Sequence, residues 1–154
     1  MTLYLVRHAS AGTRNDADPS DRDRILDPTG HQQADVLADW LQHEPITALV
    51  ASPYRRCVQT LEPLGKVLGV DVVIDERLAE GAPIESSWSL VEQFAEQTAV
   101  LCSHGDVIPD LIRRLQMRGM QIPGKSGCAK GSAWVLQHWD GELFATGLYT
   151  PVKA

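Results

Sequence analysis

The sequence predicts an α/β protein, a three-layer α/β/α sandwich with a mostly parallel central sheet of about six strands. Short apolar runs rich in β-branched residues alternate with amphipathic helical stretches along most of the chain, which is typical of parallel strands joined by helices. Near the C-terminus two such runs flank Asp140-Gly141, a turn signal that predicts a hairpin at one edge of the sheet. The length of 154 residues favours one domain with its own core, which we expect over residues 1–154.

Composition narrows the class of protein. A net charge of −6 argues against a partner that is a nucleic-acid polymer, because neutralising its phosphates needs surplus Lys and Arg. The three cysteines, Cys57, Cys102 and Cys128, are widely spaced and indicate neither a disulfide framework nor a metal site. No apolar stretch approaches the roughly 20 residues that span a bilayer, and the N-terminus lacks the layout of a signal peptide. We therefore expect a cytoplasmic protein that has no membrane partner.

The first strand ends in an unusual pair of residues. An apolar run from Thr2 to Val6 predicts a buried central strand, and Arg7-His8 follows it directly. Ligands of open α/β sheets bind beyond the carboxyl ends of the strands, and a charged group beside a buried strand is costly without a partner. The pair thus indicates an anion site, although a strand that simply ends in polar residues has the same pattern. The polar stretch 12–27 then predicts a surface loop.

Helix-start signals place the first two helices. Thr29-Gly-His-Gln32 matches a capping box and predicts a helix over about residues 30–43. Ser52-Pro53 predicts the N-cap and first turn of a second helix, which runs to about Leu68 and is stopped by Gly69. Pro63 lies inside this second helix and predicts a kink or a break there.

The other elements follow from apolar runs and turn residues. They are strands at 46–51, 70–74 and 98–102, hairpin strands at 132–138 and 142–149, a short helix over 88–95, a helix capped by Asp106 over 107–115, and loops at 75–87 and 117–130.

Three strand ends bring polar groups to one edge of this sheet. The first supplies Arg7 and His8, the second leads into a helix start with Arg55-Arg56, and the fourth ends in Ser103-His104-Gly105 before another helix start. Helix N-termini favour anions, and the planar guanidinium group of Arg holds two phosphoryl oxygens at once. The combination predicts a phosphate site.

The same residues resemble the histidine phosphatase superfamily, the phosphoglycerate-mutase-like proteins, and within it the small phosphohistidine-phosphatase-type members of branch 1. The similar motifs are Leu5-Val-Arg-His-Ala9, Asp27-Pro-Thr-Gly30 with Gln33-Ala34, Ser52-Pro53 with Arg56 and Gln59-Thr60, Arg77-Leu78 with Glu80, and Ser103-His104-Gly105. They occur in the family's order and span most of the chain. The resemblance implies a phosphoglycerate-mutase-like fold and a metal-independent phosphatase without a cofactor, which forms a phosphohistidine intermediate.

The resemblance also implies roles for individual residues. His8 would attack phosphorus as a neutral imidazole, with Arg7 and Arg56 lowering its pKa and binding the phosphoryl oxygens. His104 would donate to the same oxygens, and Glu80 would be the general acid. Considered without the motifs, a helix cap is the favoured interpretation of His104, and a solvated loop carboxylate that of Glu80.

The chain departs from the family pattern after His8. Ala9 replaces the usual glycine, and the family's asparagine that contacts phosphate has no counterpart, so Ser10 or Asn15 is the expected substitute. Gly105 completes the expected set of substrate-binding residues. Five loop cations are candidates for holding a second phosphate, although solvated loop charge explains them better: Arg14, Arg22, Arg24, Lys125 and Lys130.

The substrate stays open at this stage. It is a phosphomonoester, a phosphoanhydride or phosphohistidine, so the partner is a small phosphorylated molecule or a phosphohistidine protein. Two other functions fit the same motifs, namely a phosphomutase and a phosphate-binding module without turnover. A mutase is disfavoured because it needs a larger lid to exclude water, and retention of both His8 and Glu80 disfavours the silent module.

Overall fold

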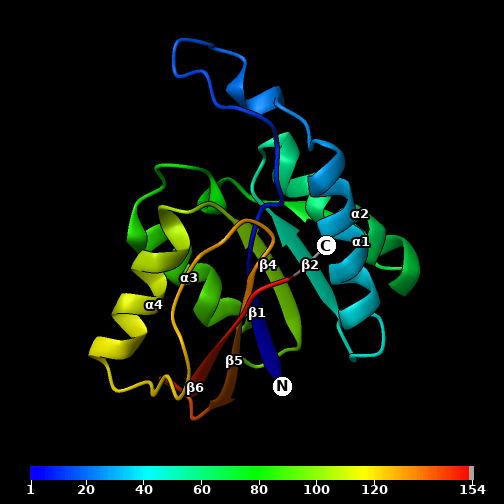
Figure 1. Cartoon of the computed structure of the whole chain (residues 1–154). Coiled ribbons are helices and arrows are strands. Elements are labelled where there is room, and N and C mark those ends of the chain that lie inside the picture. The colour runs from blue at the N-terminus through cyan, green and yellow to red at the C-terminus, as the bar shows by residue number, and fades with distance from the viewer. Residues whose placement is uncertain (153–154) are drawn as a thin grey trace.

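The computed structural model describes residues 1–152 and has the predicted α/β architecture. A single six-stranded sheet has the order β3-β2-β4-β1-β5-β6, in which β1 to β4 are parallel and the hairpin strands β5 and β6 are antiparallel (Figure 1). The strands are β1 (Thr2–Arg7), β2 (Ala48–Ala51), β3 (Val72–Ile74), β4 (Ala99–Ser103), β5 (Ala133–Trp139) and β6 (Phe144–Thr150).

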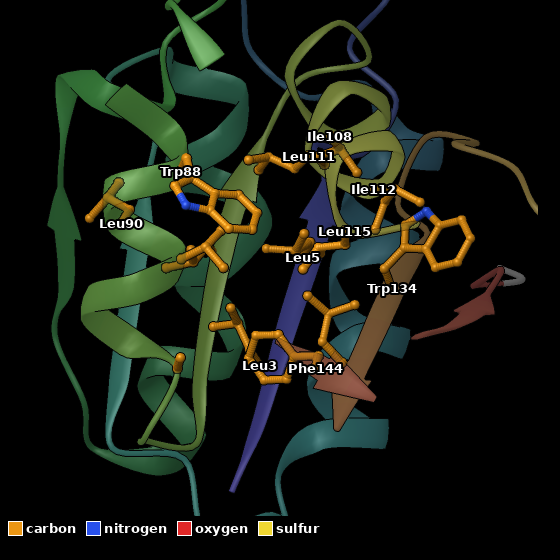
Figure 2. Close-up of a cluster of buried hydrophobic side chains, with 14 of the residues drawn as sticks. Leu3, Leu5, Trp88, Leu90, Ile108, Leu111, Ile112, Leu115, Trp134 and Phe144 are labelled. Carbon is orange, nitrogen blue, oxygen red and sulfur yellow. The ribbon is translucent and has the colours of Figure 1, made fainter. Parts of the chain in front are cut away.

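Helices cover both faces of the sheet, as the sequence predicts. They are α1 (Pro28–Leu41), α2 (Arg55–Leu68), α3 (Ile84–Phe94) and α4 (Val107–Met117). Alternate residues of β1 point to opposite faces: Leu3 and Leu5 join the core under α3 and α4 (Figure 2), and Tyr4 and Val6 join the core under α1 and α2. Within residues 1–152, none of these helices combines the length and the apolar character needed to cross a bilayer.

The capping box predicted for α1 is wrong. The helix begins at Pro28, and its N-cap is Asp27, whose carboxylate accepts a hydrogen bond from the amide of Gly30 at 2.7 Å. The same carboxylate accepts from the Ser10 hydroxyl at 2.6 Å and the Gly12 amide at 3.0 Å. These three bonds lower the pKa of Asp27 to about 2. Asp27 therefore ties the loop that follows β1 to the first turn of α1.

The start predicted for α2 is also wrong. The helix begins at Arg55, with Tyr54 at the N-cap position and no side-chain cap. The Ser52 hydroxyl instead lies 2.8 Å from Nε2 of His104. The Ser52 oxygen also accepts from the amide of Tyr54 at 3.3 Å. Ser52 thus combines a local turn contact with a long-range contact to the residue after β4, and a local capping signal cannot reveal the second.

Other boundaries differ in smaller ways. Helix α2 passes through Pro63 without a break and ends at Gly69, which adopts the predicted left-handed conformation. Helix α3 begins at Ile84, inside the stretch predicted as a loop. Asp106 occupies the N-cap position of α4 but makes no cap bond there, because its carboxylate accepts from the amide of Gly81 at 2.8 Å.

Candidate active site

The site is built on the two central strands. Strands β1 and β4 are parallel neighbours with Arg7 opposite Ser103, so His8 and His104 emerge side by side at their carboxyl ends. The ring centroids of His8 and His104 are 5.4 Å apart, and both side chains are buried. The structure thus brings together two residues that lie far apart in the chain.

Hydrogen bonds fix the tautomer of His8. Its Nδ1 lies 2.8 Å from the carbonyl oxygen of Ala9, which can only accept, so Nδ1 carries the proton and Nε2 keeps its lone pair. The Ala9 amide donates in turn to the Thr60 hydroxyl at 2.9 Å, which holds this peptide in place. Burial lowers the pKa of His8 to about 3, and the positive charge of Arg56 contributes to the shift. At neutral pH His8 is therefore an uncharged imidazole with a free nucleophilic nitrogen.

This state predicts the titration of His8. Between pH 8 and pH 4.5 its ring should stay neutral, because these values lie above the lowered pKa of about 3. The ¹³Cε1 resonance of His8, assigned by its loss in His8→Gln, should hold its position over this range in an NMR titration. A midpoint near the ordinary histidine value of about 6.5 would contradict the assignment.

Arg56 is a buried cation in the first turn of α2. Only 1% of its side chain is exposed. One terminal nitrogen donates to the carbonyl oxygen of Asp21 at 2.9 Å, and the other donates to the Asp21 carboxylate at 3.2 Å. The Glu80 carboxylate lies 3.7 Å away, and the Tyr54 ring stacks beneath the guanidinium group with its centroid 4.8 Å from Cζ. Arg56 is thus held at one position beside His8.

Arg7 is held by backbone on two sides. Its Nη1 donates to the carbonyl oxygen of Cys128 at 2.7 Å. A Cβ atom at position 105 would lie only 2.9 Å from the Cζ of Arg7, so the guanidinium group can pack here because residue 105 is glycine. Gly105 therefore acts by admitting Arg7 to the site.

Three buried side-chain nitrogen atoms on residues near His8 have no partner. Over the described part of the chain, the buried side-chain polar atoms that lack a hydrogen bond are Nε of Arg7, Nε of Arg56 and Nδ1 of His104. When Ser52 donates its hydroxyl proton to Nε2 of His104, Nδ1 carries a proton and is a donor as well. Buried donors seldom stay unsatisfied, so unpaired nitrogens on three residues near one nucleophile indicate a site for an anion with several oxygens.

Glu80 is positioned from both sides. The Ser103 hydroxyl donates to the carbonyl oxygen of Leu78 at 2.7 Å, and the Asp106 carboxylate accepts from the Gly81 amide. The Glu80 carboxylate forms an ion pair with Arg14 and lies near Arg56. These contacts place a carboxylate beside the guanidinium group of Arg56.

A cavity of about 380 Å³ opens over these groups. It is lined by Arg7, His8, Gly12, Arg14, Arg24, Arg56, Glu80, Gly105, Asp106 and Lys130. The residues described contain no cluster of three or more His, Cys, Asp or Glu side chains that could hold a metal ion.

Three predicted site residues do not line this cavity. One is His104, which is buried beside His8. The others are Ser10 and Asn15. The Ser10 hydroxyl donates to Asp27, and the Asn15 side chain accepts from the amide of Ala17 at 3.1 Å, so neither lines the site. Of the five loop cations, Arg14, Arg24 and Lys130 line the cavity, and Arg14 and Lys130 are at the same time exposed to solvent. Their clustering depends on ion pairs with Asp21 and on the path of two loops, which no local pattern in the sequence reveals.

Comparisons with known proteins show the family of the chain. Residues 3–83 match the family model of the histidine phosphatase superfamily (branch 1). The 8-oxo-(d)GTP phosphatase of Mycolicibacterium smegmatis is 35% identical over 155 residues, covering 97% of this chain and 48% of that protein. The chain spans about half the length, or less, of the curated relatives it matches.

Two solved structures have the same fold. The protein histidine phosphatase SixA complexed with tungstate has a TM-score of 0.75 at 19% identity, over 98% of this chain and 95% of that one. The mycobacterial glucosyl-3-phosphoglycerate phosphatase with VO3 has a TM-score of 0.71 at 22% identity, over 99% of both chains. With the family model covering more than half of its length, the chain belongs to branch 1 of the histidine phosphatase superfamily.

Proposed function

We propose that this chain is a metal-independent phosphatase that passes a phosphoryl group from its substrate to Nε2 of His8 and then to water. The observation that carries the proposal is the presence of unpartnered buried nitrogens on Arg7, Arg56 and His104, residues close to His8, whose Nε2 is unprotonated. A phosphoryl group bound at His8 would offer oxygen acceptors to such donors. Charge develops on its equatorial oxygens in the transition state, where such fixed donors stabilise it most.

The proposed reaction has two steps. In the first, the lone pair of Nε2 attacks phosphorus, and the bond from phosphorus to the leaving oxygen breaks with its electron pair on that oxygen. Glu80 supplies the proton that the leaving oxygen needs. In the second, a water molecule attacks the phosphohistidine, its proton passes to the Glu80 carboxylate, and the bonding pair returns to Nε2. Throughout both steps Nδ1 keeps its proton, which it donates in the hydrogen bond to the carbonyl oxygen of Ala9.

The role of Glu80 predicts a dependence on the leaving group. Glu80→Gln should reduce kcat/KM about 10²-fold or more for an alkyl phosphate, because a poor leaving oxygen needs the proton. The loss should be far smaller for p-nitrophenyl phosphate, whose leaving group is stable as an anion. Initial rates with β-glycerophosphate and p-nitrophenyl phosphate measure the difference. Equal losses on both substrates would remove the acid role from Glu80.

The names of similar proteins indicate which classes of substrate to consider. One relative is named an 8-oxo-(d)GTP phosphatase, and one structural neighbour is named a protein histidine phosphatase. A small phosphate ester, a phosphoanhydride and a phosphohistidine protein all present a terminal phosphoryl group to His8. The common reaction is thus hydrolysis of a terminal phosphoryl group.

The direct test is turnover of the purified chain on p-nitrophenyl phosphate with excess EDTA present. We expect p-nitrophenol and inorganic phosphate in equal amounts, at a rate that the chelator does not change. Transfer of phosphate to an added sugar or glycerate in place of water would identify a mutase. Stoichiometric binding of phosphate without release of p-nitrophenol would identify a binding module.

A further inference from the structure

The cavity holds more cations than the reaction centre uses. Arg7 and Arg56 adjoin His8, whereas Arg14, Arg24 and Lys130 line the same cavity from two loops. Arg14 and Arg24 lie on the loop between β1 and α1, which extends beyond the carboxyl end of the sheet (Figure 1), and Lys130 lies just before β5. On a chain with net charge −6, this concentration of positive charge in one hollow needs its own explanation.

Asp21 fixes the two loop arginines in place. Its carboxylate lies 2.9 Å from Nε of Arg24 and 3.3 Å from Nη2 of Arg14, while the same group holds Arg56. Arg24 also donates to the carbonyl oxygen of Ala11, whose side chain is buried. Arg14 and Arg24 are therefore oriented groups of the site, unlike cations at a mobile loop tip.

Charge remains after these ion pairs are counted. Five cations line the cavity. Glu80 and Asp106 line it too, and the carboxylates of Asp16 and Asp21 pair with its arginines. Five positive and four negative charges leave an excess of one. Lys130 forms no ion pair with any carboxylate among residues 1–152, so its ammonium group is available to a ligand.

The position of Arg14 indicates which part of a substrate these cations meet. Arg14 contacts Glu80, the group proposed to protonate the leaving oxygen. In-line displacement places the leaving group opposite Nε2 of His8, and the proposed acid role of Glu80 requires its carboxylate on that side. An anionic group attached to the leaving oxygen would therefore reach Arg14 and its neighbours.

We propose that Arg14, Arg24 and Lys130 form a second anion subsite that binds a phosphoryl group carried by the leaving group. The substrate class is then a phosphoanhydride, such as a nucleoside diphosphate, whose terminal phosphoryl group is transferred to His8. This inference rests on the proposed phosphatase function and narrows it. Breaking the bond between the terminal phosphorus and the bridging oxygen would leave a monophosphate in the subsite.

The test compares ADP with p-nitrophenyl phosphate, which carries one phosphoryl group. The ratio of kcat/KM on ADP to kcat/KM on p-nitrophenyl phosphate should fall about tenfold in Lys130→Gln and in Arg24→Gln, because each removes one charged contact to the second phosphoryl group. The wild-type chain should also prefer ADP over AMP. Matched controls are Lys125→Gln and Arg22→Gln, exposed cations on the same two loops outside the cavity, which should leave the ratio unchanged.

Two outcomes would overturn the subsite. One is equal kcat/KM on ADP and AMP in the wild-type chain, and the other is a ratio that the Lys130 and Arg24 variants leave at its wild-type value. In either case p-nitrophenyl phosphate would still be hydrolysed, so the phosphatase function would stand without the subsite. Absence of p-nitrophenol release from the wild-type chain would instead overturn the proposed function itself.

Discussion

Replacing His8 with glutamine is expected to reduce kcat/KM on p-nitrophenyl phosphate by about 10⁴-fold or more, because the variant has no nucleophile for the phosphoryl group. The fold should persist, since the glutamine side chain fills a similar volume at the end of β1. Initial rates and the circular dichroism spectrum of both proteins measure the two effects. His43→Gln is the matched control, since His43 is exposed and lies outside the cavity, and its rate should equal that of the wild-type chain.

A folded His8→Gln variant with more than about one hundredth of the wild-type rate would contradict the account. Such activity would mean that water attacks the substrate directly, with the buried arginines acting alone. His8 would then be a positioning residue, and the low pKa produced by its burial would have no part in the chemistry.

Arg56→Gln is expected to lower kcat/KM by about 10³-fold. The variant loses a buried charge beside the nucleophile and also the bonds that hold Asp21, so substrate binding and the transition state both weaken. Steady-state rates on p-nitrophenyl phosphate give kcat and KM separately. Arg55→Gln is a stringent control, because Arg55 is the adjacent residue but is exposed and outside the cavity, and its rate should stay within about twofold.

If Arg56→Gln and Arg55→Gln lowered kcat/KM equally, catalysis would depend on positive charge in this region and not on the position of one guanidinium group. A thermal melt separates this result from unfolding of the Arg56 variant. If Arg56→Gln melts at the wild-type temperature and retains wild-type kcat/KM, the orphaned Nε of Arg56 has no catalytic significance.

Much of the fold follows from local patterns in the sequence. The apolar runs predicted the strands, because strands of a parallel sheet that is covered on both faces consist mostly of apolar residues. Asp140-Gly141 forms the expected hairpin turn between β5 and β6. The failures concern capping residues. The Ser52 hydroxyl contacts His104, and the Asp106 carboxylate accepts a hydrogen bond from the Gly81 amide. Local capping preference alone therefore did not decide the partners of these two side chains.

In the candidate site too, local patterns predicted some residues, and long-range contacts determine the others. His8 and His104 could be placed together because each follows a parallel strand whose end must lie at one edge of the sheet. The contribution of Arg14 and Arg24 could not be predicted, because both depend on Asp21, whose carboxylate joins the loop to α2 through Arg56. Long-range ion pairs of this kind leave no periodic signal in a sequence.

The central claim is tested most directly by trapping the covalent intermediate. The chain is mixed with substrate, quenched at alkaline pH, where phosphohistidine is stable, and digested for mass spectrometry. The account predicts one phosphoryl group on the peptide that contains His8, attached at Nε2, and none on that peptide in His8→Gln. Efficient turnover by the wild-type chain with no phosphoryl group on His8 at any reaction time, or with the group on His104, would contradict it.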